Sequence, residues 1–203
     1  MRSPLSSAPL RRSLRIGAAV AALSLGSAGV AFAQAVPNRE AALEIRKRFV
    51  MDLDTLQSKF LALADAIPAD KYAWRPAQGV RSVGEVLMHV AADNYLLPSS
   101  MGHAADPKTG IKGDDYKAAQ AFERRQLSRD STIAELERSF AHVRKSLSGT
   151  TAARLGEQVP MFGQKFTVQH AWIMTATHLH EHLGQLIAYA RSNGVTPPWS
   201  QGG

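Results

Sequence analysis

The chain has 203 residues, a formal net charge of +7 and no cysteine. This length suits one domain with a substantial hydrophobic core. The lack of cysteine excludes disulfide bonds, thiolate metal ligands, a cysteine nucleophile and a lipid-modified cysteine. The fold must therefore be stabilised by its core, or by the core together with a bound metal.

Residues 1–33 have the three parts of a secretory signal peptide. Four arginines and no acidic residue accompany an apolar run over residues 16–30, and Ala31-Phe32-Ala33 forms a small-x-small cleavage site. A membrane anchor is the alternative, but the run is short and the cleavage site follows it directly. We expect cleavage near Ala33, a periplasmic or secreted location, no membrane association of the mature chain, and one domain over residues 34–203.

Removal of the leader changes what the charge implies about partners. Without the four leader arginines, 20 Lys and Arg face 17 Asp and Glu, which is a net charge of only +3. No basic stripe with interleaved aromatic residues is visible. We therefore expect no nucleic-acid partner, and a small-molecule substrate instead.

The first amphipathic segment lies between residues 38 and 67. Its apolar residues recur at spacings of three and four, at Ile45, Phe49, Leu53, Leu56, Phe60, Leu63 and Ile67. This period is that of a helix with one buried face, and Pro68 ends it. The pattern predicts one long helix.

A second helix is predicted from Ser82 to Pro98. Ser82 and Glu85 have the spacing of a capping box, in which each side chain bonds the backbone N–H of the other residue. His89 lies beside the apolar stripe of this helix, and Asp93 follows one turn later. The preceding residues 69–81 have no period and predict a connection.

Two more helices follow, each after a long connection. Residues 99–129 are polar, with a weak helical pattern near 118–125, and predict a crossover or a lid. Residues 132–148 have the apolar spacing of a third helix. After another irregular stretch, Thr167 is the predicted N-cap of a fourth helix that ends at Asn193-Gly194. Four helices without strand alternation predict an all-α four-helix bundle with long connections between helices two and three and between three and four.

The fourth helix carries three of the seven histidines within five residues, His178, His180 and His182. Residues four apart share a helix face, so His178 and His182 can direct their rings to a common point. His180 is rotated to the other side of the helix. His170 precedes His178 by about 12 Å along the axis, which is too far to share one ion.

The pair His178 and His182 has two interpretations. Hydrogen-bonded core histidines are one, and metal ligands are the other, which the spacing favours. A metal needs a third protein ligand, and His89 is the best candidate because it lies in the apolar run of the second helix. We interpret His103 as a loop residue and His142 as an exposed helical residue.

Three histidines would leave coordination positions for water or a substrate, as in catalytic sites. Asp93 and Glu181 are candidates for carboxylates that orient the imidazoles, with ordinary surface acids as the alternative. The segment from His178 to His182 also matches H-x-x-E-H of inverted zincins, with Glu181 as general base. Those proteins take an acidic third ligand from far downstream, but the 21 residues after His182 contain no acid, which argues against a protease.

Several motifs together resemble the DinB/YfiT-like superfamily. They are Trp74-Arg75-Pro76, the segment Ser82-Val83-Gly84-Glu85-Val86-Leu87-Met88-His89-Val90, and the pattern His178-x-x-x-His182-x-Gly184-Gln185-Leu186-Ile187-x-Tyr189-x-Arg191. The similarity extends from about residue 40 to residue 199, and the last pattern is its most specific part.

The resemblance implies a four-helix bundle, often a homodimer, that holds a divalent metal through three histidines at the positions of His89, His178 and His182. It also implies that Gly184 permits close helix approach, and that Gln185 supports the site or makes a packing contact. Characterised members include transferases and an isomerase that use low-molecular-weight thiols.

Two hypotheses follow. In the first, the protein is an exported metal-dependent enzyme of transferase or hydrolase type, in which Zn²⁺, Ni²⁺ or Fe²⁺ activates water or a small-molecule thiol. In the second, it is a non-catalytic binding or structural bundle whose metal links the second and fourth helices.

Overall fold

The computed structural model describes residues 38–200, and the predicted leader at residues 1–33 lies outside this part of the chain. The helices and strands of this part are α1 (Arg39–Ala66), α2 (Val83–Ser100), α3 (Tyr116–Glu123), α4 (Arg129–Gly149), β1 (Gln158–Met161), β2 (Gln164–Thr167) and α5 (Val168–Ser192). Short 3₁₀ turns lie at η1 (Ala69–Lys71), η2 (Pro107–Thr109), η3 (Ala153–Gly156) and η4 (Pro198–Ser200). Within residues 38–200, no helix is long and apolar enough to cross a membrane.

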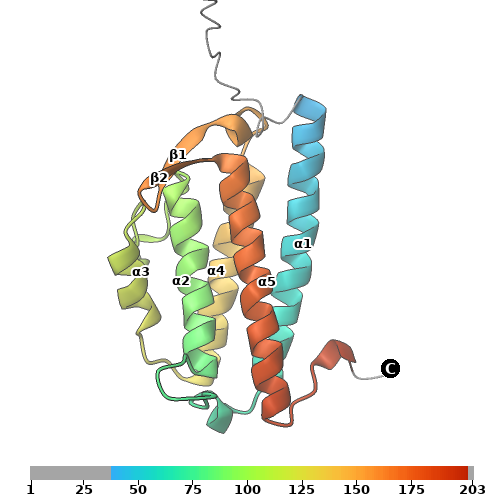
Figure 1. The fold of residues 1–203 in the computed structure, drawn as a ribbon, viewed down its shortest axis with the longest axis vertical. Coiled ribbons are helices and arrows are strands. Elements are labelled where there is room, and N and C mark those ends of the chain that lie inside the picture. Colours follow the sequence, from blue (N-terminus) through green and yellow to red (C-terminus); the bar gives the residue numbers. More distant parts are fainter. Residues whose placement is uncertain (1–37, 201–203) are drawn as a thin grey trace, which may run out of the picture. The chain divides into compact units, whose positions relative to one another are not determined.

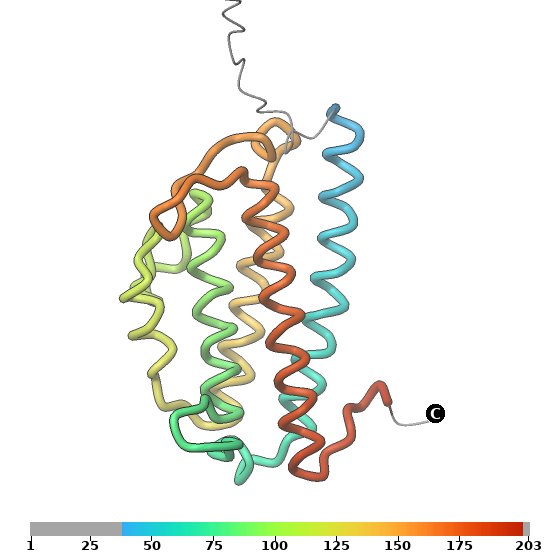
Figure 2. Tube along the Cα trace, in the orientation of Figure 1, coloured from blue at the N-terminus to red at the C-terminus, as the bar shows by residue number. Residues whose placement is uncertain are grey.

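Helices α1, α2, α4 and α5 form a four-helix bundle (Figure 1). Within the bundle, α1 contacts both α4 and α5, and α2 also contacts both α4 and α5. The trace in Figure 2 shows that α2 and α4 run in the same direction, because the connection between them returns along the length of the bundle. The prediction of an all-α four-helix bundle with two long connections is confirmed.

The core contains the apolar stripe predicted for α1. Leu56, Phe60 and Leu63 are buried, and the Phe60 ring centroid lies 5.5 Å from that of Phe140 on α4. Burying one such side chain contributes about 1.5–3 kcal/mol, so the interlocking stripes supply most of the stabilisation expected without disulfides. The N-terminus of α1 is capped by Asn38, whose Oδ1 accepts a hydrogen bond from Ala41 N–H.

The connection after α2 contains one α-helix, α3, which begins and ends two residues before the weak pattern near residues 118–125 predicted. Ala119 and Phe122 of this helix are buried. The Phe122 ring centroid lies 5.5 Å from that of Tyr95 on α2, and Ile111 earlier in the connection is also buried. Because its apolar side chains hold it against α2, the connection has the packing of a crossover rather than of a lid.

The prediction of irregular structure before Thr167 was wrong, because β1 and β2 form an antiparallel hairpin there. Phe162 and Gly163 make the turn with φ of 52° and 74°, the left-handed conformation that two-residue hairpin turns require. Each strand has only four residues and β1 contains Pro160, so the alternation is too short to stand out in the sequence. The hairpin ends at Thr167, which is the N-cap of α5 as predicted.

Two helical glycines differ in what surrounds them. A Cβ atom at Gly84 would lie 3.4 Å from the backbone oxygen of Tyr72, so glycine lets the connection before α2 approach that helix. A Cβ atom at Gly184 would meet no heavy atom within 4 Å. The expectation that Gly184 permits close helix approach is therefore wrong.

Candidate metal centre

One face of α5 presents His178 and His182, one turn apart. Their ring centroids are separated by 4.4 Å. His180 is exposed on another face, where its Nε2 lies 3.0 Å from Asp52 Oδ2 of α1, and His170 packs against the hairpin. Helix geometry thus divides the crowded histidines as predicted, into one converging pair and two separate residues.

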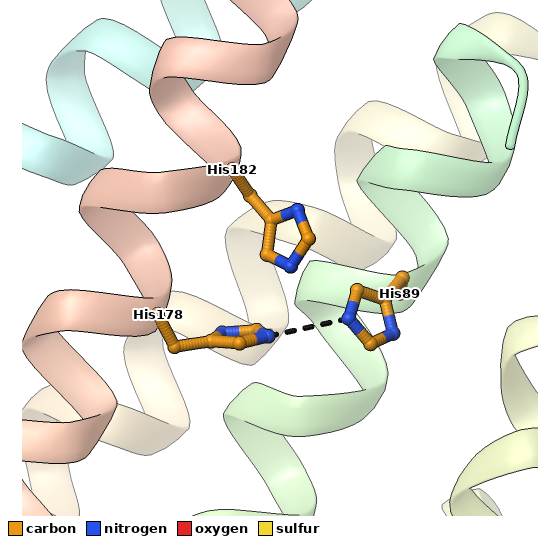
Figure 3. Close-up of side chains that lie close together, drawn as sticks. All are labelled: His89, His178 and His182. Atoms are coloured by element: carbon orange, nitrogen blue, oxygen red, sulfur yellow. Dashed lines mark hydrogen bonds between the residues drawn. The ribbon is translucent and has the colours of Figure 1, made fainter. Parts of the chain in front are cut away.

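The third imidazole, His89, comes from α2. The capping box fixes the first turn of this helix, since Ser82 N–H donates to Glu85 Oε2 at 2.7 Å and Glu85 N–H donates to Ser82 Oγ. The His89 ring centroid is 4.7 Å from that of His182 and 5.1 Å from that of His178. One nitrogen of each ring lies within 4.8 Å of the others, and Figure 3 shows the three rings converging between α2 and α5.

The ring of His182 is oriented by Gln185. Gln185 Oε1 lies 2.8 Å from His182 Nδ1, while the amide nitrogen of Gln185 donates to Tyr189 Oη at 3.0 Å. An amide oxygen can only accept, so His182 carries its proton on Nδ1 and Nε2 keeps a lone pair. Burial lowers the pKa of His182, which favours this neutral form. The contact with His182 agrees with the first of the two roles that the resemblance implies for Gln185.

The ring of His89 is oriented by Glu123 at the end of α3. Glu123 Oε2 lies 3.1 Å from His89 Nδ1, and Glu123 Oε1 accepts a hydrogen bond from Arg81 Nε at 2.5 Å. Burial alone would raise the pKa of Glu123, but the bonds with His89 and Arg81 outweigh it and lower the pKa to about 2. The carboxylate thus stays charged and accepts the Nδ1 proton of His89, so that Nε2 faces the other histidines.

Sequence reasoning missed Glu123. The residue lies 34 positions from His89, at the end of a helix whose pattern in the sequence is weak. Carboxylates that orient metal-binding histidines are common, but nothing local relates this one to His89. The only available signal was the apolar pair Ala119 and Phe122 at helical spacing, which would have predicted α3 but not the contact of Glu123 with His89.

The two carboxylates predicted to orient the imidazoles have different positions. Asp93 is close to the cluster, with Oδ2 3.0 Å from His178 Nε2 and 3.5 Å from His89 Nε2. Glu181 is exposed, and within residues 38–200 it has no hydrogen bond or ion pair with the three histidines. Its charge acts on His182 only as a minor influence that raises the pKa.

The donors suit a divalent transition metal. His89 Nε2 and His178 Nε2 face each other at 3.2 Å, a separation that a proton on His178 or a cation bound by both nitrogens would satisfy. Neutral imidazoles are ligands for Zn²⁺, Ni²⁺ and Fe²⁺, and two nearby carboxylates add the negative charge that stabilises a cation. The side chains of His89 and His178 are 12% and 19% exposed, so the centre is largely buried but not fully closed to solvent.

Comparisons with known proteins agree with this fold. A family model for the DinB superfamily matches residues 52–186. A DinB-like protein from Bacillus cereus has 18% sequence identity and a TM-score of 0.59, covering 78% of this chain and 95% of that one. A DinB-like protein, YjoA, from Bacillus subtilis has 22% identity and a TM-score of 0.54, covering 73% and 93%. The search among curated proteins found no match.

Proposed function

Because the chain belongs to the DinB superfamily, whose model matches residues 52–186, we propose that it is a divalent-metal-dependent enzyme with His89, His178 and His182 as ligands. The observation that carries this proposal is the convergence of one nitrogen from each of the three rings. Two of the rings are held by partners on Nδ1, which leaves Nε2 for the ion.

A bound divalent ion would supply Lewis acidity toward a small-molecule substrate or its nucleophile. The protein's own contribution is to fix the donors. Gln185 holds His182, and Glu123 holds His89 while Arg81 holds Glu123. Such preorganised support keeps ligands in place without reorganisation when substrate binds. The small exposed part of His89 and His178 is where a substrate would reach the ion. These features favour a transferase or hydrolase that acts on a small molecule.

Zn²⁺, Ni²⁺ and Fe²⁺ are all compatible with three imidazoles. The basic and apolar leader at residues 1–33 supports action after export, in the periplasm or outside the cell. A thiol cosubstrate would be one way to use the metal, and a homodimer would agree with the family resemblance.

Metal analysis of the untagged protein tests this proposal. We expect about one equivalent of ion per chain in the wild type and loss of that ion in His178→Ala and His89→Ala. His180→Ala is the matched control, because it removes an imidazole of the same helix that is paired with Asp52 instead. The proposal fails if the wild type and His178→Ala are both metal-free and equally stable.

The alternative is a non-catalytic protein whose metal only links α2 and α5. The observation that supports it is that the three ligands come from these two separate helices. Removal of the ion would then lower the melting temperature, since an ion at 100 times its Kd stabilises the folded state by about 2.7 kcal/mol. Small thiols added to the Co²⁺ form distinguish the functions. A change in the Co²⁺ spectrum on thiol addition supports the enzyme, and an unchanged spectrum supports the helix link.

A further inference from the structure

Asp93 lies on the side of the imidazoles from which an ion would be bound. Its Oδ2 contacts the Nε2 atoms of His178 and His89 at 3.0 and 3.5 Å. Glu123 and Gln185, by contrast, contact Nδ1 atoms, at the back of their rings. Since Asp93 follows His89 by four residues, α2 places both side chains on one face. Asp93 is therefore positioned among the donors rather than among the groups that orient them.

The distances among these atoms suit donors around one ion. Ligands that lie about 2.0–2.2 Å from a metal are separated from one another by roughly 3–3.5 Å. The separations here are 3.2 Å between the two nitrogens, and 3.0 and 3.5 Å from each nitrogen to Asp93 Oδ2. A triangle of this size is small enough for one ion to reach all three corners at bonding distance.

Among the described residues, Asp93 forms no ion pair with a lysine or arginine, and Arg81 acts on it only through its charge at longer range. Within the described residues its ion pairs are with His89 and His178 alone, and its side chain is only 14% exposed. Glu123 differs, because Arg81 is its partner. A single proton on His178 Nε2 would have to be shared between Asp93 Oδ2 at 3.0 Å and His89 Nε2 at 3.2 Å, because His89 has its own proton on Nδ1. A cation at that point satisfies all three atoms.

We propose that Asp93 is a fourth protein donor, so that the centre is a three-histidine, one-carboxylate site. This proposal rests on the proposed metal binding and determines what the ion can do. Four protein donors complete the coordination of a tetrahedral Zn²⁺, which would leave a closed structural site. An ion with octahedral coordination keeps further positions for substrate, so the donor set favours Fe²⁺ or Ni²⁺ if the protein is an enzyme.

Replacement of Asp93 by cysteine tests direct coordination. The chain has no cysteine of its own, so any thiolate-to-Co²⁺ charge-transfer absorption must come from the introduced residue. We expect this absorption in Asp93→Cys when the full chain is loaded with less than one equivalent of Co²⁺. The matched control is Asp52→Cys, where the aspartate also contacts a histidine but lies outside the cluster, and we expect no such absorption there. Co²⁺ bound by Asp93→Cys without this absorption overturns the proposal.

Competition with a chromophoric chelator gives a second readout through Asp93→Asn, which retains the shape of the side chain. We expect its Co²⁺ affinity to fall more than about 100-fold, beyond the 10–100-fold range of residues that only orient ligands. Asp52→Asn should bind as the wild type does, and circular dichroism of the metal-free variants verifies folding. A loss of less than about 100-fold in Asp93→Asn overturns the proposal, because residues that only orient ligands account for it. Failure of the proposed function has a different signature, in which the wild type binds no Co²⁺ or His178→Ala binds it equally well.

Discussion

Two groups of histidines in the same bundle differ in the side chains that surround them. The candidate metal centre combines His89, His178 and His182 with the carboxylates of Asp93 and Glu123. The second group is His103, just after α2, and His142 on α4, which we call the His103–His142 pair. The contacts of this pair are hydroxyl groups, aromatic rings and a hydrogen bond between His142 and the backbone of His103. The difference shows that the arrangement of the nitrogens and the nearby charge, rather than the number of histidines, distinguish a metal site from packing.

The contacts of the His103–His142 pair leave no common point for an ion. His103 Nε2 lies 3.1 Å from Thr150 Oγ1, which also accepts a hydrogen bond from Trp172 Nε1. The ring of His142 packs on Tyr95 with centroids 5.5 Å apart, and its Nε2 is buried without a hydrogen-bond partner among the described residues. The prediction that His142 is exposed was therefore wrong.

Among the substitutions that test this difference between the two groups, Glu123→Gln should have the largest effect, a loss of metal affinity. Glutamine retains the shape but removes the charge that holds His89, and loss of such a supporting residue costs about 10–100-fold in metal affinity. That is roughly 1.4–2.7 kcal/mol in binding free energy. Competition titrations with Zn²⁺ or Co²⁺ measure it. His142→Phe is the control from the other group, and equal losses in both variants would contradict the distinction between the groups.

The carboxylate of Glu123, which sequence reasoning missed, shows what limited the prediction of the site. The α5 half of the site could be predicted because i and i+4 positions share a helix face, and Gln185 follows within the same turn. His89 could be found because its helix has a capping box and an apolar stripe. Glu123 reaches the site only through the path of the crossover, which local periodicity does not determine. His142 was misjudged because burial beside Tyr95 depends on the packing of two helices.

Acid should weaken the fold through the His103–His142 pair. Burial lowers the pKa of both residues, and the charge of Arg154 lowers that of His103 further. The unfolded chain therefore takes up these protons first, so stability is constant above about pH 6.5 and falls as pH drops below it. Each group contributes at most about 1.4 kcal/mol per pH unit, and less here because both are only partly buried.

Urea unfolding of the metal-free protein between pH 7.5 and 5.5 measures this slope. His142→Phe should make the slope shallower, because its ring can pack on Tyr95 without taking up a proton. His182 also has a lowered pKa and contributes to the same pH range, so the wild type and the variant are compared without metal. An unchanged slope in His142→Phe would show that the pair is already protonated or solvated in the folded state.

The smallest expected effects come from alanine substitutions at two helical glycines, one beside each group of histidines. These substitutions should change the stability of the fold without changing its metal affinity. Gly184 on α5 lies between His182 and Gln185, and an added Cβ meets no heavy atom within 4 Å. Alanine should therefore stabilise α5 by up to about 1 kcal/mol, the difference in helix propensity, with unchanged metal affinity. Gly149 ends α4 beside His103, whose Cε1 would lie 4.0 Å from the new Cβ.

Gly149→Ala should gain less than Gly184→Ala, because a helix end has less propensity to recover than a helix interior. Thermal unfolding of both metal-free variants measures the two gains, and chelator competition measures affinity. If Gly184→Ala is more stable but binds metal more weakly, flexibility of α5 is needed to bring His182 to the ion. The three rings would then converge by adjustment on binding, and the rigid preorganisation inferred from Gln185 and Glu123 would not hold.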